Sequence, residues 1–353
     1  MAVLCQLADP ANYRAFDWNL LDDPADLTYW LDLYASFPSN IEPHLRRDGL
    51  TGDHFDERWR AFLTEYGAGL SARRENPTAY GALSTIALGD FRRSMLNKHG
   101  WPDPYICVKQ RENELAAKLY PRVVHEIDAR PQGSRWDMLL RGLFAGNMFD
   151  LGAPKTIAMY NSGQIDYHQI LERIPPRPWF IDHADALCKR LDTDPYKQVL
   201  FFVDNAGTDI VLGVIPMVRE LARTGIRVVM AANSAPALND ITIAELNPLL
   251  ERLSKYDPIL RQQLGDGQIK TVASGTTSPL IDLSLISDEC NEVAAESDLI
   301  VLEGMARGVE SNWRQKFLCD VWRVALVKDA TVAKWIGCRL FDPVCRFDTA
   351  STS

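Results

Sequence analysis

The sequence lacks the features that mark secreted, membrane and nucleic-acid-binding proteins. Its seven cysteines are scattered, with no CxxC pair and no Cys/His cluster at zinc spacing, so we expect reduced thiols. No segment reaches about 18 uninterrupted apolar residues, and no basic region followed by a long apolar run opens the chain. The net charge of -9 argues against a nucleic-acid-binding protein, which would need a concentrated basic surface. We therefore expect a cytoplasmic protein without nucleic-acid or membrane partners, and the sequence leaves its oligomeric state open.

Several motifs of other α/β enzymes are also missing. A dinucleotide-binding fold requires GxGxxG after its first strand, and Gly207 and Gly213 are too far apart to supply it. The segment GTDIVLGV, residues 207–214, lacks the lysine and the hydroxyl residue of a P-loop. DNAGT, residues 204–208, differs from the DxDx[TV] motif of haloacid-dehalogenase-type phosphatases, and no GxSxG elbow occurs. These absences argue against four common α/β chemistries.

The composition is that of a globular protein, and the sequence pattern divides the chain into two parts. The 353 residues, 46% of them hydrophobic, suffice for a large core. In residues 56–74 and 111–129 apolar side chains recur every three or four positions, the period of amphipathic helices. After the prolines of residues 172–179, short β-rich runs alternate with helical patterns. We expect a mainly helical domain over 1–175 and an α/β domain over 176–353.

The second half predicts a Rossmann-like fold. Its β-rich runs are residues 198–203, 226–232, 269–274, 299–302 and 323–327. Strands that alternate with helices at this spacing imply right-handed βαβ units and a mostly parallel sheet with helices on both faces, a three-layer domain. Pro216 should kink or restart the helix that follows the first strand.

Polar side chains follow every predicted strand, at the edge where open α/β sheets bind ligands. In strand order they are Asp204 and Asn205, then Asn233 and Asp240, then Ser274 and Gly275, then Glu303 to Arg307, and last Lys328. Each has an ordinary explanation by itself, because an aspartate often caps a helix and a lysine often ends a strand in solvent. The loop 274–279 is rich in small and hydroxyl residues, so its backbone N–H groups could surround an anion. Convergence of all these groups at one edge favours a ligand site.

The residue types at this edge suit a metal ion and a phosphate. Asp204, Asn205 and Asp240 offer the oxygen ligands that hard divalent cations prefer. Two carboxylates neutralise a divalent cation, whereas a third would repel a phosphate, and a neutral asparagine avoids that repulsion. Arg307 and Lys328 supply positive charge for the oxygens of a transferring phosphoryl group. A helix N-terminus after residue 207 adds backbone donors.

Two long stretches carry a resemblance to a known family. Residues 201–242, which include FFVDNAGTDIVLGV, and residues 296–312, ESDLIVLEGMARGVESN, resemble the metal-dependent damage-control phosphatases, formerly a domain of unknown function. The similarity is to the subfamily marked by an EGMGR motif. It extends through residues 103–121, 141–153 and 327–347, about residues 100 to 346 in all.

The resemblance implies a set of site residues and one divalent cation, Mn²⁺, Mg²⁺, Co²⁺ or Ni²⁺. It places the metal on Asp204, Asn205 and Asp240, the substrate at Glu303, Gly304, Met305 and Arg307 with Lys328 nearby, and Asn147 and Asp150 of GNMFD beside the pocket. Asp204 and Lys328 are the candidate catalytic residues. Ala306 departs from the family because it replaces the second glycine of EGMGR, adding a methyl group and restricting the backbone, and Gly308 could restore flexibility.

The activity that the resemblance implies is hydrolysis of a small phosphorylated metabolite, above all 4′-phosphopantetheine or its S-sulfonate, as damage control around coenzyme A synthesis. The nucleophile is either water or a carboxylate such as Asp204. Sugar phosphates are alternative substrates. A carboxyl methyltransferase and a catalytically weak metabolite-binding protein are the alternative functions.

Overall fold

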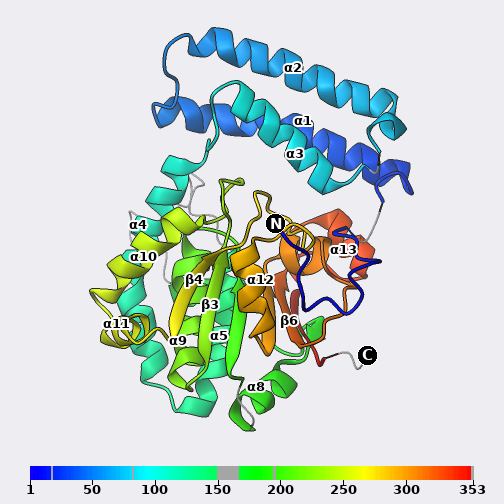
Figure 1. Ribbon diagram of the computed structural model, residues 1–353. Helices are drawn as coiled ribbons and strands as arrows, with labels where there is room; N and C mark the ends of the chain where they lie inside the picture. The colour runs from blue at the N-terminus through cyan, green and yellow to red at the C-terminus, as the bar shows by residue number, and fades with distance from the viewer. Residues whose placement is uncertain (17–18, 82, 149–166, 194–195, 351–353) are drawn as a thin grey trace.

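The computed structural model describes residues 1–16, 19–81, 83–148, 167–193 and 196–350. A seven-stranded sheet, in the order β1-β7-β6-β5-β2-β3-β4, forms its centre (Figure 1). The strands are β1 (Ile181–Asp182), β2 (Gln198–Phe202), β3 (Arg227–Ala232), β4 (Ile269–Ala273), β5 (Leu299–Glu303), β6 (Asp320–Leu326) and β7 (Pro343–Asp348). Only the β6–β7 pair is antiparallel among the strands of the described residues. The predicted mostly parallel α/β sheet is thereby confirmed.

The five predicted strands correspond to β2 to β6, and the sequence pattern missed β1 and β7. β7 follows β6 through α13 (Ala330–Ile336) but turns back antiparallel to it, so it does not continue the βαβ series. β1 has two residues, too few to show a periodic pattern. After β2, Pro216 lies in the first turn of α9 (Ile215–Arg223), where it restarts the helix as predicted.

The sheet is buried on both faces because its strands alternate their side chains between two cores. Val199 and Phe201 of β2 belong to one hydrophobic cluster, and Leu200 and Phe202 belong to another. The first cluster is covered by α4 (Ile106–Asp128), α5 (Gln132–Met148), α8 (Ala184–Thr193), α9, α10 (Ile243–Ser254) and α11 (Pro258–Gly265), with the short α7 (Tyr167–Arg173) packed at its margin. The second is covered by α12 (Asp288–Ala295) and by the first residues of the chain.

Helices α4 and α5 therefore form part of the α/β layers, although both precede residue 175 in sequence. Tyr120 and Phe144 are fully buried in the same cluster as Phe201. The predicted domain division at residue 175 stays a prediction, and the packing places these two helices with the sheet.

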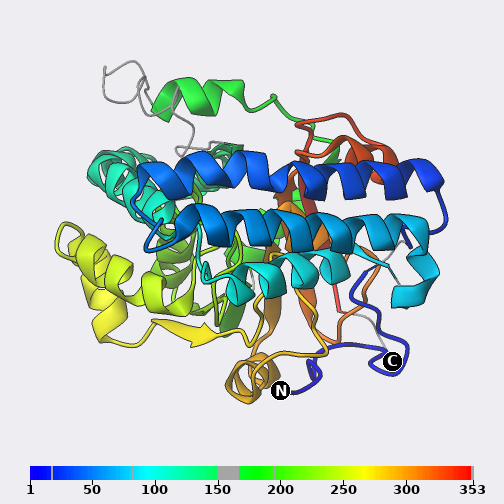
Figure 2. The ribbon, with the colours of Figure 1, turned by 90° about the horizontal axis from the view of Figure 1, so that it is seen from above.

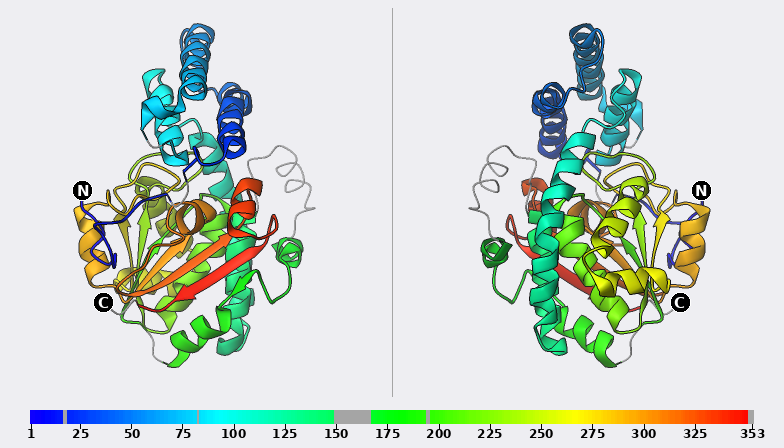
Figure 3. Two further views of the ribbon diagram at one scale, coloured as in Figure 1. Left: turned by 90° about the vertical axis from the view of Figure 1, so that its right-hand side faces the viewer. Right: turned by 90° about the vertical axis from the view of Figure 1, so that its left-hand side faces the viewer.

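The remaining N-terminal helices pack against one another in a separate layer, which we call the helical cap. It comprises α1 (Pro24–Arg47), α2 (Phe55–Glu75) and α3 (Thr85–Lys98), with the 3₁₀ turn η1 (Pro77–Tyr80) between the last two. These helices run side by side across the molecule in Figure 2, and Figure 3 shows the helical cap above the sheet from both sides. Their apolar stripes pack against Val327 at the end of β6 and Val332 of α13. Among the described residues, none of the helices combines the length and the hydropathy that a membrane span requires.

Candidate active site

The first site residues come from the connection between β2 and α9. The chain leaves the buried strand at Asp204 and turns at Gly207, whose φ of +78° favours glycine. A Cβ there would also lie 2.8 Å from a carboxylate oxygen of Glu112. A π-helix, η2 (Asp209–Val214), follows the turn and carries Asp209 in its first position. π-helical turns are frequent at functional sites because they shift side chains off the ordinary helical path.

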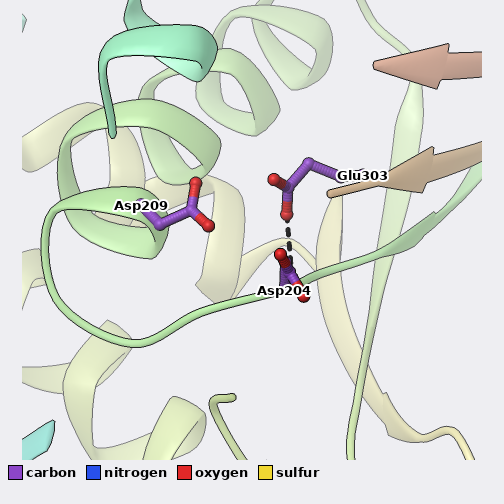
Figure 4. A group of neighbouring side chains, drawn as sticks. All are labelled: Asp204, Asp209 and Glu303. Atoms are coloured by element: carbon purple, nitrogen blue, oxygen red, sulfur yellow. Dashed lines mark hydrogen bonds between the residues drawn. The ribbon is translucent and has the colours of Figure 1, made fainter. Parts of the chain in front are cut away.

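Three buried carboxylates meet at this point. The side chains of Asp204, Asp209 and Glu303 each place an oxygen within 4.8 Å of the others, a grouping that could hold a metal ion. Figure 4 shows that they converge from a loop, a helix and a strand end. Glu303 Oε2 accepts a 2.8 Å hydrogen bond from the Asp204 backbone N–H, which ties the ends of β2 and β5 together. The Asn147 amide donates to all three acids, at 2.8 to 3.4 Å.

A second group lies on the other side of Asp204. Arg307 donates to Asp204 Oδ1 and, at 2.7 Å, to Asp240 Oδ2, so its guanidinium bridges the two predicted metal ligands. Asn233 donates to the same Asp240 oxygen at 3.0 Å and accepts from Arg307 at 3.2 Å. The third predicted ligand, Asn205, donates to Asp204 at 2.8 Å. The structure thus brings all these predicted residues together.

The capping explanation for the two aspartates does not hold in this structure. Helix α10 is capped by Thr242 and Glu245, which form a reciprocal capping box, rather than by Asp240. The residue at the N-cap of η2 is Thr208, four residues after Asp204. Both aspartates instead direct their carboxylates to Arg307, and both are more than nine-tenths buried.

Burial raises the pKa of most acids at the site. It raises the pKa of Asp209 to about 6, with the nearby Asp204 charge adding to the effect. Burial also raises the pKa of Asp240 to about 7 although Arg307 opposes that shift, and it raises the pKa of Glu303 well above its usual range. Although burial disfavours its charge, Asp240 and Asp204 raise the pKa of Arg307, which remains a cation.

These charges and one unpartnered oxygen fit a divalent cation. The acids at the strand ends are Asp204, Asp209, Asp240 and Glu303, and the bases facing them are Arg307 and Lys328. Acids therefore outnumber bases at this edge, and a divalent cation would favour the ionised form of carboxylates that burial otherwise keeps protonated. Asp209 Oδ1 is buried and accepts no hydrogen bond among the described residues, so Asp204, Asp209 and Glu303 form an inner group that could also hold an ion, beside the predicted set of Asp204, Asn205 and Asp240.

The backbone conformation of the EGMAR segment requires a glycine at position 304. The φ of Gly304 is +94°, and a Cβ on this residue would overlap Asp204 Oδ2. Met305 accepts a hydrogen bond from the Lys328 backbone N–H at its sulfur, 3.2 Å away. Ala306 opens the π-helix η3 (Ala306–Glu310) and is not among the positive-φ residues, so its methyl causes no backbone strain. Gly308 packs closely, because a Cβ there would lie 2.9 Å from the carbonyl of Leu302.

The polar groups of the loop after β4 already form hydrogen bonds, within the loop and with the loop after β3. The Ser274 hydroxyl lies 2.7 Å from the hydroxyl of Thr276, and the Gly275 N–H donates to Ser234 at 2.9 Å. Neither Ser274 nor Gly275 lines the cavity described next. An anion would have to replace these bonds, so the predicted anion-binding role of the loop stays a prediction.

A cavity of about 320 Å³ opens at the strand ends beneath the helical cap. On the sheet side it is lined by Asp204, Asn205, Leu238, Asn239, Asp240, Pro279, Leu280, Met305, Ala306, Glu310, Lys328 and Asp329, and on the cap side by Trp30, Leu33, Tyr34, Thr85 and Arg92. Lys328 Nζ donates to the Asn147 carbonyl at 2.9 Å, which holds the lysine near the acids. The cavity size lies at the lower end of the range for ligand pockets.

The sequence reasoning missed part of this site. Asp150 lies outside the described residues, and Asn147 reaches the acids as described. Asp209 could have been noticed as a carboxylate at the start of the helix after the first strand. The cap residues Trp30 and Arg92 carry no local motif, because only long-range packing brings their helices over the sheet.

The fold and the site together define an α/β protein with an acidic, metal-compatible centre and two cationic groups suited to a phosphate. The chain belongs to the family described as the damage-control phosphatase ARMT1-like domain, whose model matches residues 35–344. This finding confirms the resemblance seen in the sequence, and it supports phosphatase activity.

Individual relatives agree with this assignment. The chain is 34% identical to the damage-control phosphatase At2g17340 of Arabidopsis thaliana, across 93% of this chain and 90% of that protein. It is 31% identical to the 4′-phosphopantetheine phosphatase of Mus musculus and 33% identical to pantothenate kinase 2 of Arabidopsis thaliana. These alignments cover 97% and 98% of this chain but 48% and 41% of those proteins, so the chain spans less than half of either. A solved duf89 family protein from Pyrococcus horikoshii has the same fold, with a TM-score of 0.64, 19% identity and coverage of 90% of this chain and 96% of that one.

Proposed function

We propose that this chain hydrolyses a small phosphorylated metabolite in a reaction that depends on a divalent cation. The observation that carries the proposal is the group of four buried acids and two bases at one edge of the sheet, of which Asp204, Asp240 and Lys328 line a cavity of about 320 Å³. Family membership supports the same reaction class. When bound, a divalent cation there would bind phosphate oxygens and offset their negative charge.

Asp204, Asn205 and Asp240 are the proposed metal ligands. Their side chains line the cavity, whereas Asp209 and Glu303 lie behind Asp204 and do not line it. A cation held by Asp204 and Asp240 would release Arg307 from bridging them and leave its guanidinium for the phosphate. Asp209 and Glu303 then hold Asp204 in place through Asn147 and the Asp204 backbone N–H.

Arg307 and Lys328 are the proposed phosphate ligands. Lys328 lines the cavity, and its ammonium has only the Asn147 carbonyl as a hydrogen-bond partner among the described residues. Charge-assisted bonds to a phosphate dianion contribute about 1.5–3 kcal/mol each. Asp204 either attacks phosphorus or orients a water that does so.

The proposed substrate is 4′-phosphopantetheine or its S-sulfonate. The mouse relative, a 4′-phosphopantetheine phosphatase, supports this choice, as does a cavity that continues from the acids to the helical cap. We expect these two compounds to outrank sugar phosphates and an aryl phosphate in specificity constant, measured by phosphate release with Mn²⁺, Co²⁺ or Ni²⁺. A sugar phosphate that outranked both by tenfold would contradict the substrate, and transfer of a methyl group without phosphate release would contradict the reaction.

Anomalous diffraction from crystals soaked with Mn²⁺ tests the ligand set. The expected peak lies among Asp204, Asn205 and Asp240, with Arg307 displaced from Asp204. A peak among Asp204, Asp209 and Glu303 would show that the inner acids hold the ion instead. Asp240→Asn should then weaken Mn²⁺ binding far less than Asp209→Asn, the reverse of what we expect.

A further inference from the structure

Helix α4 presents polar side chains to the sheet side of the molecule that the proposed chemistry does not use. Residues 103–121 are one of the stretches that carry the family resemblance, yet none of them lines the strand-end cavity. Lys109 and Asn113 lie one helical turn apart on the same face of α4, which packs against η2 and α10. Lys109 is fully buried. Polar groups that are buried between elements need partners across the contact, and these two have them.

Asn113 binds the loop that carries the first two proposed metal ligands. Its Oδ1 accepts a 2.7 Å hydrogen bond from the Gly207 N–H. Gly207 lies two residues after Asn205 and three after Asp204. Asn113 thereby fixes the point at which the chain turns from β2 into η2.

Lys109 is connected to the loop that carries the third proposed ligand, through one intermediate side chain. Its Nζ pairs with Glu245 at 2.8 Å and with Asp103 at 2.9 Å. Glu245 Oε2 in turn accepts hydrogen bonds from the backbone N–H and the hydroxyl of Thr242, at 2.9 and 2.8 Å. Thr242 lies two residues after Asp240, so the Lys109 ammonium anchors the end of this loop to α4.

The two loops also contact each other directly. The Ile241 N–H donates to the Asp204 carbonyl at 3.0 Å, and Asn205 pairs with Asp240 in an isolated antiparallel β-bridge. The distance between the two proposed carboxylate ligands therefore depends on where each loop is held. Both loops are attached to one rigid helix, at positions four residues apart and thus about 6 Å apart along its axis.

We propose that Lys109 and Asn113 are positioning residues, which hold the two loops at the spacing that lets Asp204 and Asp240 bind one divalent cation. This inference rests on the proposed function for the identity of the metal ligands. Neither side chain lines the cavity, so their loss should act on metal affinity and leave the reaction to the groups at the strand ends. Partners that orient metal ligands typically contribute about 10-fold to 100-fold in metal affinity.

Asn113→Leu removes the acceptor and nearly keeps the size of the side chain. Titration calorimetry of the metal-free protein with Mn²⁺ should give a dissociation constant about tenfold or more above that of the wild type. Asn291→Leu is the matched control, because Asn291 Oδ1 on α12 accepts a 2.8 Å bond from the Cys5 N–H and does not line the cavity. It should keep the wild-type constant. Asn113→Asp retains an acceptor and should bind Mn²⁺ at least as tightly as the wild type.

Lys109→Met gives a result whose sign separates positioning from charge. Loss of a nearby cation by itself would strengthen Mn²⁺ binding, whereas loss of the anchor should weaken it, and we expect binding about tenfold weaker. The double variant Lys109→Met/Glu245→Gln removes the same link, leaves no unpaired charge on residue 245 and keeps an oxygen for Thr242. It should also weaken Mn²⁺ binding. Circular dichroism checks folding, and the double variant decides where the single variant does not fold.

Phosphate release separates positioning from catalysis. In Asn113→Leu and in the double variant, the Mn²⁺ concentration that gives half the maximal rate should rise about tenfold. The rate at saturating Mn²⁺ should approach that of the wild type, because a bound cation itself holds the two carboxylates together. A low rate that persisted at saturating Mn²⁺ would contradict a role limited to positioning.

The remaining outcomes divide this inference from the proposed function. Unchanged Mn²⁺ affinity in Asn113→Leu, or tighter binding in both Lys109 variants, would overturn the inference while the phosphatase stood. Weaker binding in Asn113→Leu alone would contradict the shared role of the two residues. Mn²⁺ binding that depends on both, without phosphate release from any ester, would support the inference and contradict the proposed reaction. Failure of the wild type to bind Mn²⁺ would contradict both.

Discussion

The absence of a side chain at Gly304 leaves the space that the Asp204 carboxylate occupies. Its φ of +94° disfavours every other residue, and the Cβ of any such residue would overlap Asp204 Oδ2. Gly304→Ala should displace Asp204 and lower the specificity constant by about a hundredfold, the cost of misplacing a reacting group by about 1 Å.

Gly133→Ala is the control for that substitution. Gly133 lies near the start of α5, has no atom within 4 Å of its Cβ position, and does not have a positive φ. Phosphate release and circular dichroism should both match the wild type. Full activity in Gly304→Ala would show that Asp204 does not need its present position.

Glu310 is expected to make the stability of the protein depend on pH. It lies in the cavity wall, 5% exposed, and burial together with the charges of Asp329 and Asp204 raises its pKa to about 8 from 4.5. Between these values the folded protein keeps a proton that the unfolded chain releases. The free energy of unfolding therefore falls as pH rises through this window, by up to about 1.4 kcal/mol per pH unit from this group.

Glu310→Gln removes the titration and keeps the shape. Urea denaturation at pH 5.5, 6.5 and 7.5 should give a flatter decline for this variant than for the wild type, with both proteins free of divalent metal. Asp209, Asp240 and Glu303 contribute to both profiles and cancel in the comparison. Parallel profiles would show that Glu310 is ionised in the folded protein at neutral pH.

At the residue scale, strand ends were the informative part of the sequence. Asp204, Asp240, Arg307 and Lys328 could be placed together because parallel strands end at one edge. The direct bridge from Arg307 to both aspartates could not be foreseen, since side-chain pairing depends on distances that spacing does not give. Glu310 was missed for a related reason: its burial depends on the cap.

At the scale of secondary-structure elements, two π-helices and one close contact between helices determine the positions of the site residues. η2 and η3 lie in the connections that follow β2 and β5, and they carry Asp209 and Arg307 into the centre of the site. Helix α5 approaches η2 so closely that a Cβ on Gly146 would lie 3.0 Å from the Asp209 Cα atom. Neither π-helix follows from an apolar pattern, because the 3.6-residue period describes ordinary helices only.

Gly146→Ala should separate α5 from η2. Both atoms nearest to the added methyl belong to the backbone and cannot rotate away, so we expect a loss of about 1–3 kcal/mol in the free energy of unfolding. Phosphate release should fall as well, since Asn147 and Asp209 lie on the two sides of this contact. Gly67→Ala, in open space on α2, should instead raise stability by about 1 kcal/mol in the same urea titration. Equal stabilities for the two variants would contradict the contact.

The whole molecule combines a sheet that carries the proposed catalytic and metal-binding residues with a cap that forms the far wall of the cavity. The parallel sheet and the helical N-terminal region could be predicted from hydrophobic periodicity. The place of the cap above the strand ends could not, because the side chains that join cap and sheet, such as Trp30 and Val327, are far apart in sequence. For the same reason α4 and α5 could not be assigned to the sheet.

Ligands of different length should therefore protect different parts of the molecule from hydrogen exchange. If the proposed substrate 4′-phosphopantetheine S-sulfonate binds across the cavity, it should slow exchange in α1 and α3 as well as at the strand ends. Inorganic phosphate should slow exchange only near Asp204 and Lys328. Equal protection of α1 and α3 by both ligands would mean that the cap responds to phosphate alone.

Phosphate release by chelator-treated protein tests the central claim, a phosphatase site built on a divalent cation, most directly. With 4′-phosphopantetheine as substrate, we predict no turnover after chelation, recovery on addition of Mn²⁺, and no recovery in Asp204→Asn. Turnover that persisted in the chelated wild type, or that Mn²⁺ restored fully in Asp204→Asn, would contradict it.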